Sequence, residues 1–287
     1  MPSASCGYSA RLSAVEARRP RQTSCSVPFQ SPALPGFLLW ELSRESSCAA
    51  SIPRMQVRTL DFVAGAKAAT GIAVVIDVFR AFTVAAHAMA SGARTVIPIA
   101  DIERARELKR RNPNWLLVGE RHARPLPGFD FGNSPSALLT HDVRDKVVVH
   151  TTHAGTQGLT NADQADEVLT GALVNAAAIV RYIRAKGASE VTLVRMGHEA
   201  RERCEEDDLC AQILAARLLD QHVDTQDIRA RLRHAAGAQK FFDPACDWAP
   251  ESDFDLCTEL DRFDFVLTLD RTASPACLRR IDVPTTV

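Results

Sequence analysis

An acid, an arginine and a hydroxyl follow a strongly apolar run at short spacing. Asp77 comes directly after residues 72–76, and Arg80 and Thr83 lie a little further along. A carboxylate can bind a divalent cation or act as a nucleophile, and a guanidinium binds phosphate or carboxylate groups. An aspartate just before a helix can also serve only as its N-cap. Asp77 therefore has two interpretations at this stage.

A second group of polar residues lies in a long predicted loop, residues 119–135. Glu120 is a candidate base for activating water, and Arg121 is a candidate clamp for an anion. The loop ends with Asn133 and Ser134 before a proline, which is typical of a helix start whose free N–H groups bind an anion. The alternative is a well-capped helix after an ordinary loop. Structureless loops of this length are uncommon in compact domains, which favours a function.

A third group, residues 151–156, combines hydroxyls with a glycine. Thr152, Gly155 and Thr156 form a candidate phosphate cradle of backbone N–H groups and side-chain oxygens. The segment is not a Walker sequence, because no Gly-Lys-Ser/Thr follows. His153 is a candidate acid or base, although a lone histidine near a turn is more often a surface or capping residue.

Four consecutive acids occupy residues 205–208 at the start of a predicted helix. The helix macrodipole alone favours acids at this position. Their presence in one more loop of a set rich in anion-binding groups favours a second interpretation, in which a divalent cation balances the carboxylates. Glu206 and Asp207 are the candidate ligands.

Secondary-structure elements must bring these groups together. Along the chain, short apolar runs typical of strands alternate with segments whose apolar residues recur at helical spacing. Strands separated by helices predict an α/β fold, with a mostly parallel sheet flanked by helices. Such folds bind ligands at the carboxyl ends of their strands, where these groups lie. Strands are predicted over residues 72–76, 95–99, 115–118, 146–150, 167–169, 190–195 and 263–269. Helices are predicted over residues 80–91, 102–111, 155–162, 175–186 and 224–235.

Composition excludes several classes of partner. The net charge is −1, so no general basic field favours nucleic acid or anionic lipid. No apolar run reaches the ~20 residues that span a bilayer. The eight cysteines show no CxxC pair or zinc-type spacing, which predicts free thiols and a cytoplasmic protein. The sequence leaves open whether the chain forms a homo-oligomer.

The first part of the chain differs from the rest. Residues 1–54 are rich in Ser, Pro, Arg and Ala and show no sustained period, which predicts a disordered extension. We expect an α/β domain over residues 55–287, with a division into two subdomains near 140–175 left open. Whether residues 1–54 belong to the native protein is also left open.

Four motifs in the same order resemble the 2-phosphosulfolactate phosphatase family, in particular its bacterial members. They are residues 75–83, 127–135, 151–156 and 206–211, within a resemblance over residues 59–269. The resemblance implies an α/β protein with two related halves and a Mg²⁺-dependent phosphatase. The implied reaction releases phosphate from 2-phospho-3-sulfolactate, a step toward coenzyme M. Residues 121–124 lack the paired glycines of the family pattern, which puts the substrate in doubt more than the reaction class.

The resemblance and the residue types together suggest a role for each group. We expect Mg²⁺ to be held by Asp77 with Glu206 or Asp207, and water to be activated by Glu120. Arg80 and the helix start at Asn133 and Ser134 are expected to hold phosphate. The sulfonate or carboxylate end of the substrate is expected to contact Arg121, Thr152 and Thr156, and Gly155 is also expected to bind substrate.

Two other classes of function use the same residues differently. A regulatory protein would bind phosphorylated metabolites without turnover, and a structural paralogue would only assemble with partners. Within the enzyme hypothesis, Asp77 can bind metal or attack phosphorus. The haloacid-dehalogenase signature needs a second Asp two positions later, where this chain has Phe79, so a metal-activated water is preferred.

Overall fold

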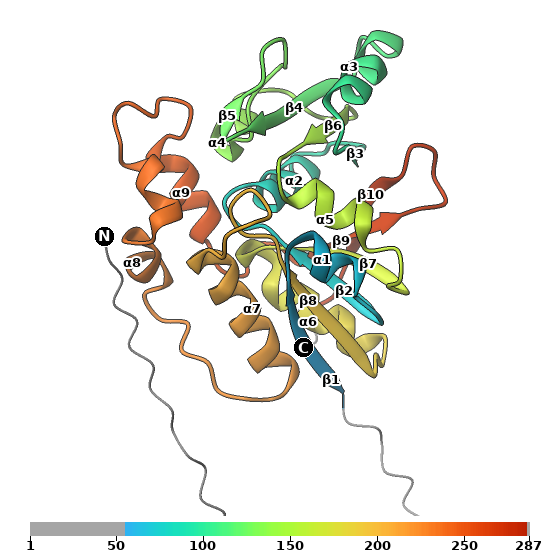
Figure 1. Ribbon diagram of the computed structural model, residues 1–287, viewed down its shortest axis with the longest axis vertical. Helices are drawn as coiled ribbons and strands as arrows, with labels where there is room; N and C mark the ends of the chain where they lie inside the picture. The colour runs from blue at the N-terminus through green and yellow to red at the C-terminus, as the bar shows by residue number, and fades with distance from the viewer. Residues whose placement is uncertain (1–54, 286–287) are drawn as a thin grey trace, which may run out of the picture. The chain divides into compact units, whose positions relative to one another are not determined.

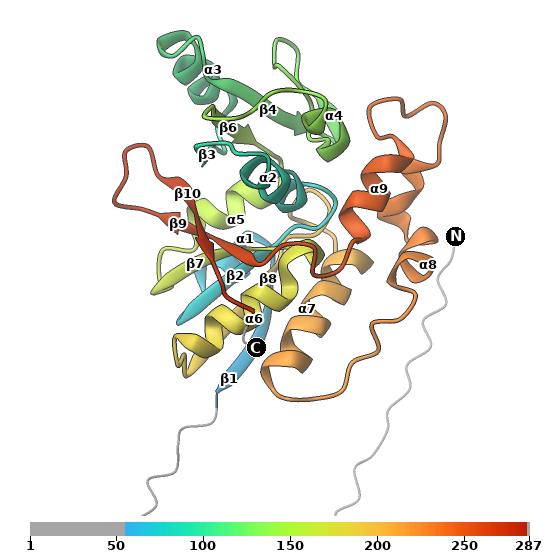
Figure 2. The ribbon, with the colours of Figure 1, turned by 180° about the vertical axis from the view of Figure 1, so that it is seen from behind.

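A ten-stranded mixed sheet organises the chain in the computed structural model, which describes residues 55–285 (Figures 1 and 2). The extension predicted over residues 1–54 lies outside the described residues. The strands are β1 (Gln56–Asp61), β2 (Ile72–Ile76), β3 (Thr95–Pro98), β4 (Leu116–Arg121), β5 (Arg124–Pro125), β6 (Val147–Thr151), β7 (Glu167–Gly171), β8 (Glu190–Arg195), β9 (Phe265–Asp270) and β10 (Cys277–Asp282).

Helices connect most of these strands. The α-helices are α1 (Phe62–Lys67), α2 (Ala81–Ala90), α3 (Ile102–Arg111), α4 (Pro135–Leu139), α5 (Gly155–Asn161), α6 (Ala176–Ala185), α7 (Glu205–Leu218), α8 (Ile228–Arg233) and α9 (Glu251–Thr258). Two 3₁₀ helices are η1 (Leu173–Asn175) and η2 (Ala236–Phe241). Within residues 55–285, none of the helices has the length and apolar character needed to cross a bilayer.

The strand order is β1-β8-β2-β7-β9-β10-β3-β6-β4-β5. Strands β1, β8, β2 and β7 pair in parallel, and so do β3, β6 and β4. The antiparallel pair β9 and β10 lies between the two parallel groups, as both ribbon views show. The predicted α/β class with mostly parallel strands is confirmed, and the division near 140–175 stays a prediction.

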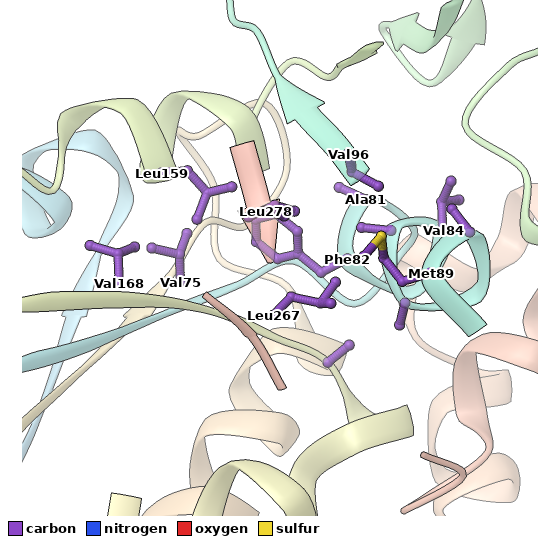
Figure 3. Close-up of a cluster of buried hydrophobic side chains, with 14 of the residues drawn as sticks. Val75, Ala81, Phe82, Val84, Met89, Val96, Leu159, Val168, Leu267 and Leu278 are labelled. Atoms are coloured by element: carbon purple, nitrogen blue, oxygen red, sulfur yellow. The ribbon is translucent and has the colours of Figure 1, made fainter. Parts of the chain in front are cut away.

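Every residue of β2 is buried, because helices cover both faces of the sheet in this region. Val75 packs with Phe82 of α2 and Leu159 of α5 on one face (Figure 3). Val74 packs with Ile179 of α6 on the other face. A central strand buried on both sides reads as a continuous apolar run, which is why the sequence located it correctly.

Two elements near the C-terminus were not predicted. The strand expected to be last, at residues 263–269, is followed by β10, which pairs with both β9 and β3. Only the first two residues of β10 are buried, so it lacks an apolar pattern. Helix α9 was also missed, and the helix expected over residues 224–235 contains only α8, which begins after Asp227 in a left-handed conformation.

Candidate active site

A cavity of about 470 Å³ lies where the predicted polar groups meet. Its walls come from the segments that follow β2, β4, β6 and β8, the start of α7, the 3₁₀ helix η2 and the loop before α9. Six of the predicted site residues line it: Asp77, Arg80, Glu120, Asn133, Glu206 and Asp207. The other five do not line it: Arg121, Ser134, Thr152, Gly155 and Thr156.

Asp77 is fixed by two backbone donors. The N–H of Ala81 donates to Oδ1 over 3.2 Å, and the N–H of Gly155 donates to Oδ2 over 2.9 Å. Asp77 therefore supports the start of α2 and also lines the cavity, and its role in metal binding or attack on phosphorus stays a prediction. Burial, with a smaller effect from Glu120, raises the pKa of Asp77 to about 7.

Asp207 lines the same cavity in the same kind of environment. Its Oδ1 accepts from the N–H of Val78 over 2.9 Å, and its Oδ2 accepts from the N–H of Gly197 over 2.8 Å. Burial raises the pKa of Asp207 well above its ordinary value, and the charges of Asp77 and Glu206 act in the same direction. Three acids thus share one buried volume.

Glu206 completes this acidic wall. Burial raises the pKa of its carboxyl, and its Oε2 atom is buried without a hydrogen-bond partner among the described residues. Each bonded oxygen of Asp77 and Asp207 keeps a further lone pair. Mg²⁺ prefers oxygen ligands, binds through one or two carboxylates and keeps several waters. The carboxylates of this wall, with the unpartnered Oε2 of Glu206, fit these requirements.

Lys240 of η2 is a cation in the cavity wall that the sequence did not single out. Burial and the charge of Arg80 lower the pKa of Lys240, while Glu206 and Asp77 act in the opposite direction. Its ammonium lies 5.1 Å from the ring centroid of Phe241. A desolvated lysine beside carboxylates supplies a fixed positive charge for an anionic ligand.

Arg80 is held from behind by a second unpredicted residue, Asp253 of α9. Arg80 Nη1 lies 2.6 Å from Asp253 Oδ2, and both side chains are almost fully buried, at 2% and 0% exposed. The other carboxylate oxygen of Asp253 accepts from the hydroxyls of Ser134 and Ser136 and from the N–H of Ser136. The helix start expected to receive phosphate therefore binds Asp253, because α9 packs against α4.

Glu120 connects two loops at the cavity wall. Its Oε2 accepts from the N–H of Ala123 over 2.7 Å, and its Oε1 accepts from the N–H of His153 over 2.7 Å. The role of water activation assigned to Glu120 stays a prediction.

Three residues expected to bind substrate make other contacts. The guanidinium of Arg121 donates to the carbonyl oxygens of Glu120 and Ala100, both over 2.7 Å. The Thr152 hydroxyl accepts from the N–H of Thr156, and the Thr156 hydroxyl donates to the carbonyl oxygen of Thr152. These contacts hold the start of α5 and the end of β4, and substrate binding by the three side chains stays a prediction.

In the part of the chain that the structure describes, the side-chain NH₂ group of Asn133 remains free to bind a ligand. Its Oδ1 lies 3.0 Å from Nε2 of His150, and burial lowers the pKa of this histidine to about 4. His150 is therefore neutral at pH 7 and can donate to Asn133 without adding charge. Among the described residues, no hydrogen bond uses the amide NH₂ of Asn133, which therefore can donate to a ligand in the cavity.

The cysteines behave as predicted within the described part of the chain. Cys204 and Cys210 are free thiols, and Cys204 lines the cavity. Burial raises the pKa of both thiols, so neither is a thiolate at neutral pH.

The fold and the site define an α/β enzyme whose cavity combines buried acids with a buried arginine and a half-buried lysine, a combination suited to a phosphorylated anion. The family model described as "2-phosphosulpholactate phosphatase" matches residues 59–272. The chain belongs to the 2-phosphosulfolactate phosphatase family and is a phosphoric monoester hydrolase. The predicted family is confirmed.

Individual relatives agree with this assignment. A protein of a Synechococcus species named "Probable 2-phosphosulfolactate phosphatase" is 35% identical over 217 residues, which cover 68% of this chain and 86% of the relative. A Thermotoga petrophila protein of the same name is 31% identical over 209 residues, covering 69% and 88%. For a Caldanaerobacter subterraneus protein, also of that name, the identity is 38% over 130 residues, and the match spans only 54% of the relative.

Proposed function

We propose that this enzyme is a Mg²⁺-dependent phosphatase that hydrolyses 2-phospho-3-sulfolactate to 3-sulfolactate and phosphate. The names of its relatives support the substrate. The observation that carries the reaction is the position of Asp77, Glu206 and Asp207 in one cavity with Arg80 and Lys240. Acids alone would repel a phosphate, and cations alone would not bind a divalent ion.

Asp77, Glu206 and Asp207 are the residues that would hold Mg²⁺. A bound Mg²⁺ neutralises charge on the phosphoryl oxygens and lowers the pKa of a coordinated water. The raised pKa values of the three carboxyls fit this role, because a cation that replaces their protons removes the cost of burying like charges.

Arg80, Lys240 and Asn133 provide the donors for the substrate. The two cations face a dianionic phosphate, and their positions are fixed before it binds: Arg80 by Asp253, and Lys240 by its contacts with the rings of Phe79 and Phe241. Preorganised donors of this kind stabilise charge in the transition state without reorganisation. Glu120 accepts a proton from the attacking water, with its orientation fixed by two backbone N–H groups.

A phosphate-release screen tests this function. The purified full chain is incubated with small phosphorylated hydroxy acids, including 2-phospho-3-sulfolactate, with Mg²⁺ and with a chelator in its place. We expect the fastest release from the sulfonated substrate, and only with Mg²⁺. Tight binding of these acids with no release over hours would instead support the regulatory alternative.

A further inference from the structure

Two imidazoles and a carboxylate meet at the rim of the cavity, on three loops that are far apart in the sequence. His122 lies between β4 and β5, His153 lies between β6 and α5, and Glu199 follows β8. One ligand atom from each residue lies within 4.8 Å of the other two. This set is separate from the wall formed by Asp77 and Asp207.

The contacts among His122, His153 and Glu199 leave a ring nitrogen of His153 free to bind a ligand. His122 Nδ1 lies 2.5 Å from Glu199 Oε1, and this contact lowers the pKa of the Glu199 carboxyl. The rings of His122 and His153 are 5.2 Å apart between centroids. Nδ1 of His153 is buried and has no hydrogen-bond partner among the described residues. A buried polar nitrogen without a partner is costly unless a ligand satisfies it.

The backbone around these residues adopts conformations that favour glycine. His122 and Ala123 form the turn between β4 and β5 with φ values of 52° and 62°, and Glu199 has φ of 52°. Two-residue hairpin turns of this type strongly prefer Asn-Gly. A non-glycine residue there costs about 1–2 kcal/mol. The chain thus carries a histidine and a glutamate where smaller residues would be more stable.

Glu120 holds two of the three loops in place. One of its oxygens accepts from the N–H of Ala123, beside His122, and the other accepts from the N–H of His153 itself. The side chain of Glu120 is 7% exposed. One buried carboxylate therefore fixes the backbone of the two loops that carry the imidazoles.

We propose that His122, His153 and Glu199 bind a divalent transition metal ion of the Zn²⁺ class. Imidazole nitrogen suits Zn²⁺ and is a poor ligand for Mg²⁺, so the chemistry differs from that of the oxygen-only wall. Zn–N distances are about 2.0–2.1 Å, so ligand atoms this close together need only side-chain rotations. With three protein ligands, a bound Zn²⁺ would keep a fourth position for water or a ligand. The proposal does not depend on the substrate or on Mg²⁺-dependent turnover.

Calorimetric titration tests the site directly. The full chain is freed of metal with a chelator, kept in excess Mg²⁺ to fill the oxygen-only wall, and titrated with Zn²⁺. We expect His122→Ala, His153→Ala and Glu199→Gln each to weaken one Zn²⁺ site at least about tenfold. His222→Ala, an exposed histidine outside the cavity, is the control and keeps wild-type binding. The His122 side chain is 70% exposed, so His122→Ala tests the site without loss of packing.

Co²⁺ identifies the ligands in a second measurement. We expect visible d–d absorption that His122→Ala removes, without a thiolate charge-transfer band. Zn²⁺ binding that is equal in wild type and all three variants overturns the proposal. A thiolate band that Cys204→Ser abolishes also overturns it, because it would assign the metal to the thiol in the same cavity. Neither result depends on phosphate release, so failure of this proposal is distinguishable from failure of the phosphatase function.

Discussion

Gly155 and Asp77 are in contact through a hydrogen bond that only glycine allows. The N–H of Gly155 donates to Asp77 Oδ2 over 2.9 Å, and a Cβ at position 155 would lie 2.8 Å from the same oxygen. A methyl group there must displace the carboxylate. The first residue of α5 therefore fixes the position of Asp77, the carboxylate that follows β2.

This contact predicts that Gly155→Ala lowers kcat/KM by at least about 100-fold, the size expected when a catalytic group is displaced. The control is Gly187→Ala, where nothing lies within 4 Å but φ is +62°, so the substitution costs stability without reaching the site. Steady-state phosphate release by the two variants provides the comparison. Equal activities would show that Asp77 does not need its present position.

The ion pair between Arg80 and Asp253 predicts a large effect on stability. Asp253→Ala leaves a buried guanidinium uncompensated, so we expect the free energy of unfolding to fall by about 3–5 kcal/mol. The control is Asp142→Ala, which removes an exposed ion pair with Arg144. We expect its free energy of unfolding to change by less than about 1 kcal/mol. Urea unfolding measures both. A loss for Asp253→Ala as small as that for Asp142→Ala would contradict the buried pair.

The raised pKa of Asp77 predicts that the stability of the metal-free protein depends on pH. Its pKa is about 7 when folded, against 3.8 for an unperturbed carboxyl, so between these values the folded state binds more protons than the unfolded state. The free energy of unfolding therefore falls as pH rises from about 4 to about 7, by at most ~1.4 kcal/mol per pH unit from this group. Asp77→Asn should flatten this slope in urea unfolding at several pH values. Parallel curves for the variant and wild type would contradict the assignment.

Substitution of Lys240 is predicted to lower activity without unfolding the protein. Lys240→Met removes the cation beside Asp77 and Glu206, and we expect kcat/KM to fall at least about 100-fold. Lys186→Met, at a half-exposed lysine beside Tyr182, is the control and should leave activity unchanged. Phosphate release and circular dichroism together separate the two effects. Full activity in Lys240→Met would exclude this residue from phosphate binding.

The sequence predicted the elements with strong local signals. The strands β2 and β8 and the helix α3 have the predicted bounds, because continuous apolar runs and a capping aspartate mark them. Asp253 and Lys240 were missed because α9 and η2 show no clear period in the sequence. Only packing brings Asp253 to Arg80 and Lys240 to the cavity. The Ser134 helix start was read as open to an anion because its partner is 119 residues away.

Phosphate release by Asp77→Asn tests the central claim most directly. The variant keeps the size of the side chain and removes the charge that the proposed Mg²⁺ site and the reaction both need. With 2-phospho-3-sulfolactate and Mg²⁺, we predict that wild type releases one phosphate per substrate molecule and that Asp77→Asn loses at least about 1000-fold in kcat/KM. Retention of most wild-type activity by Asp77→Asn would contradict both roles proposed for this residue.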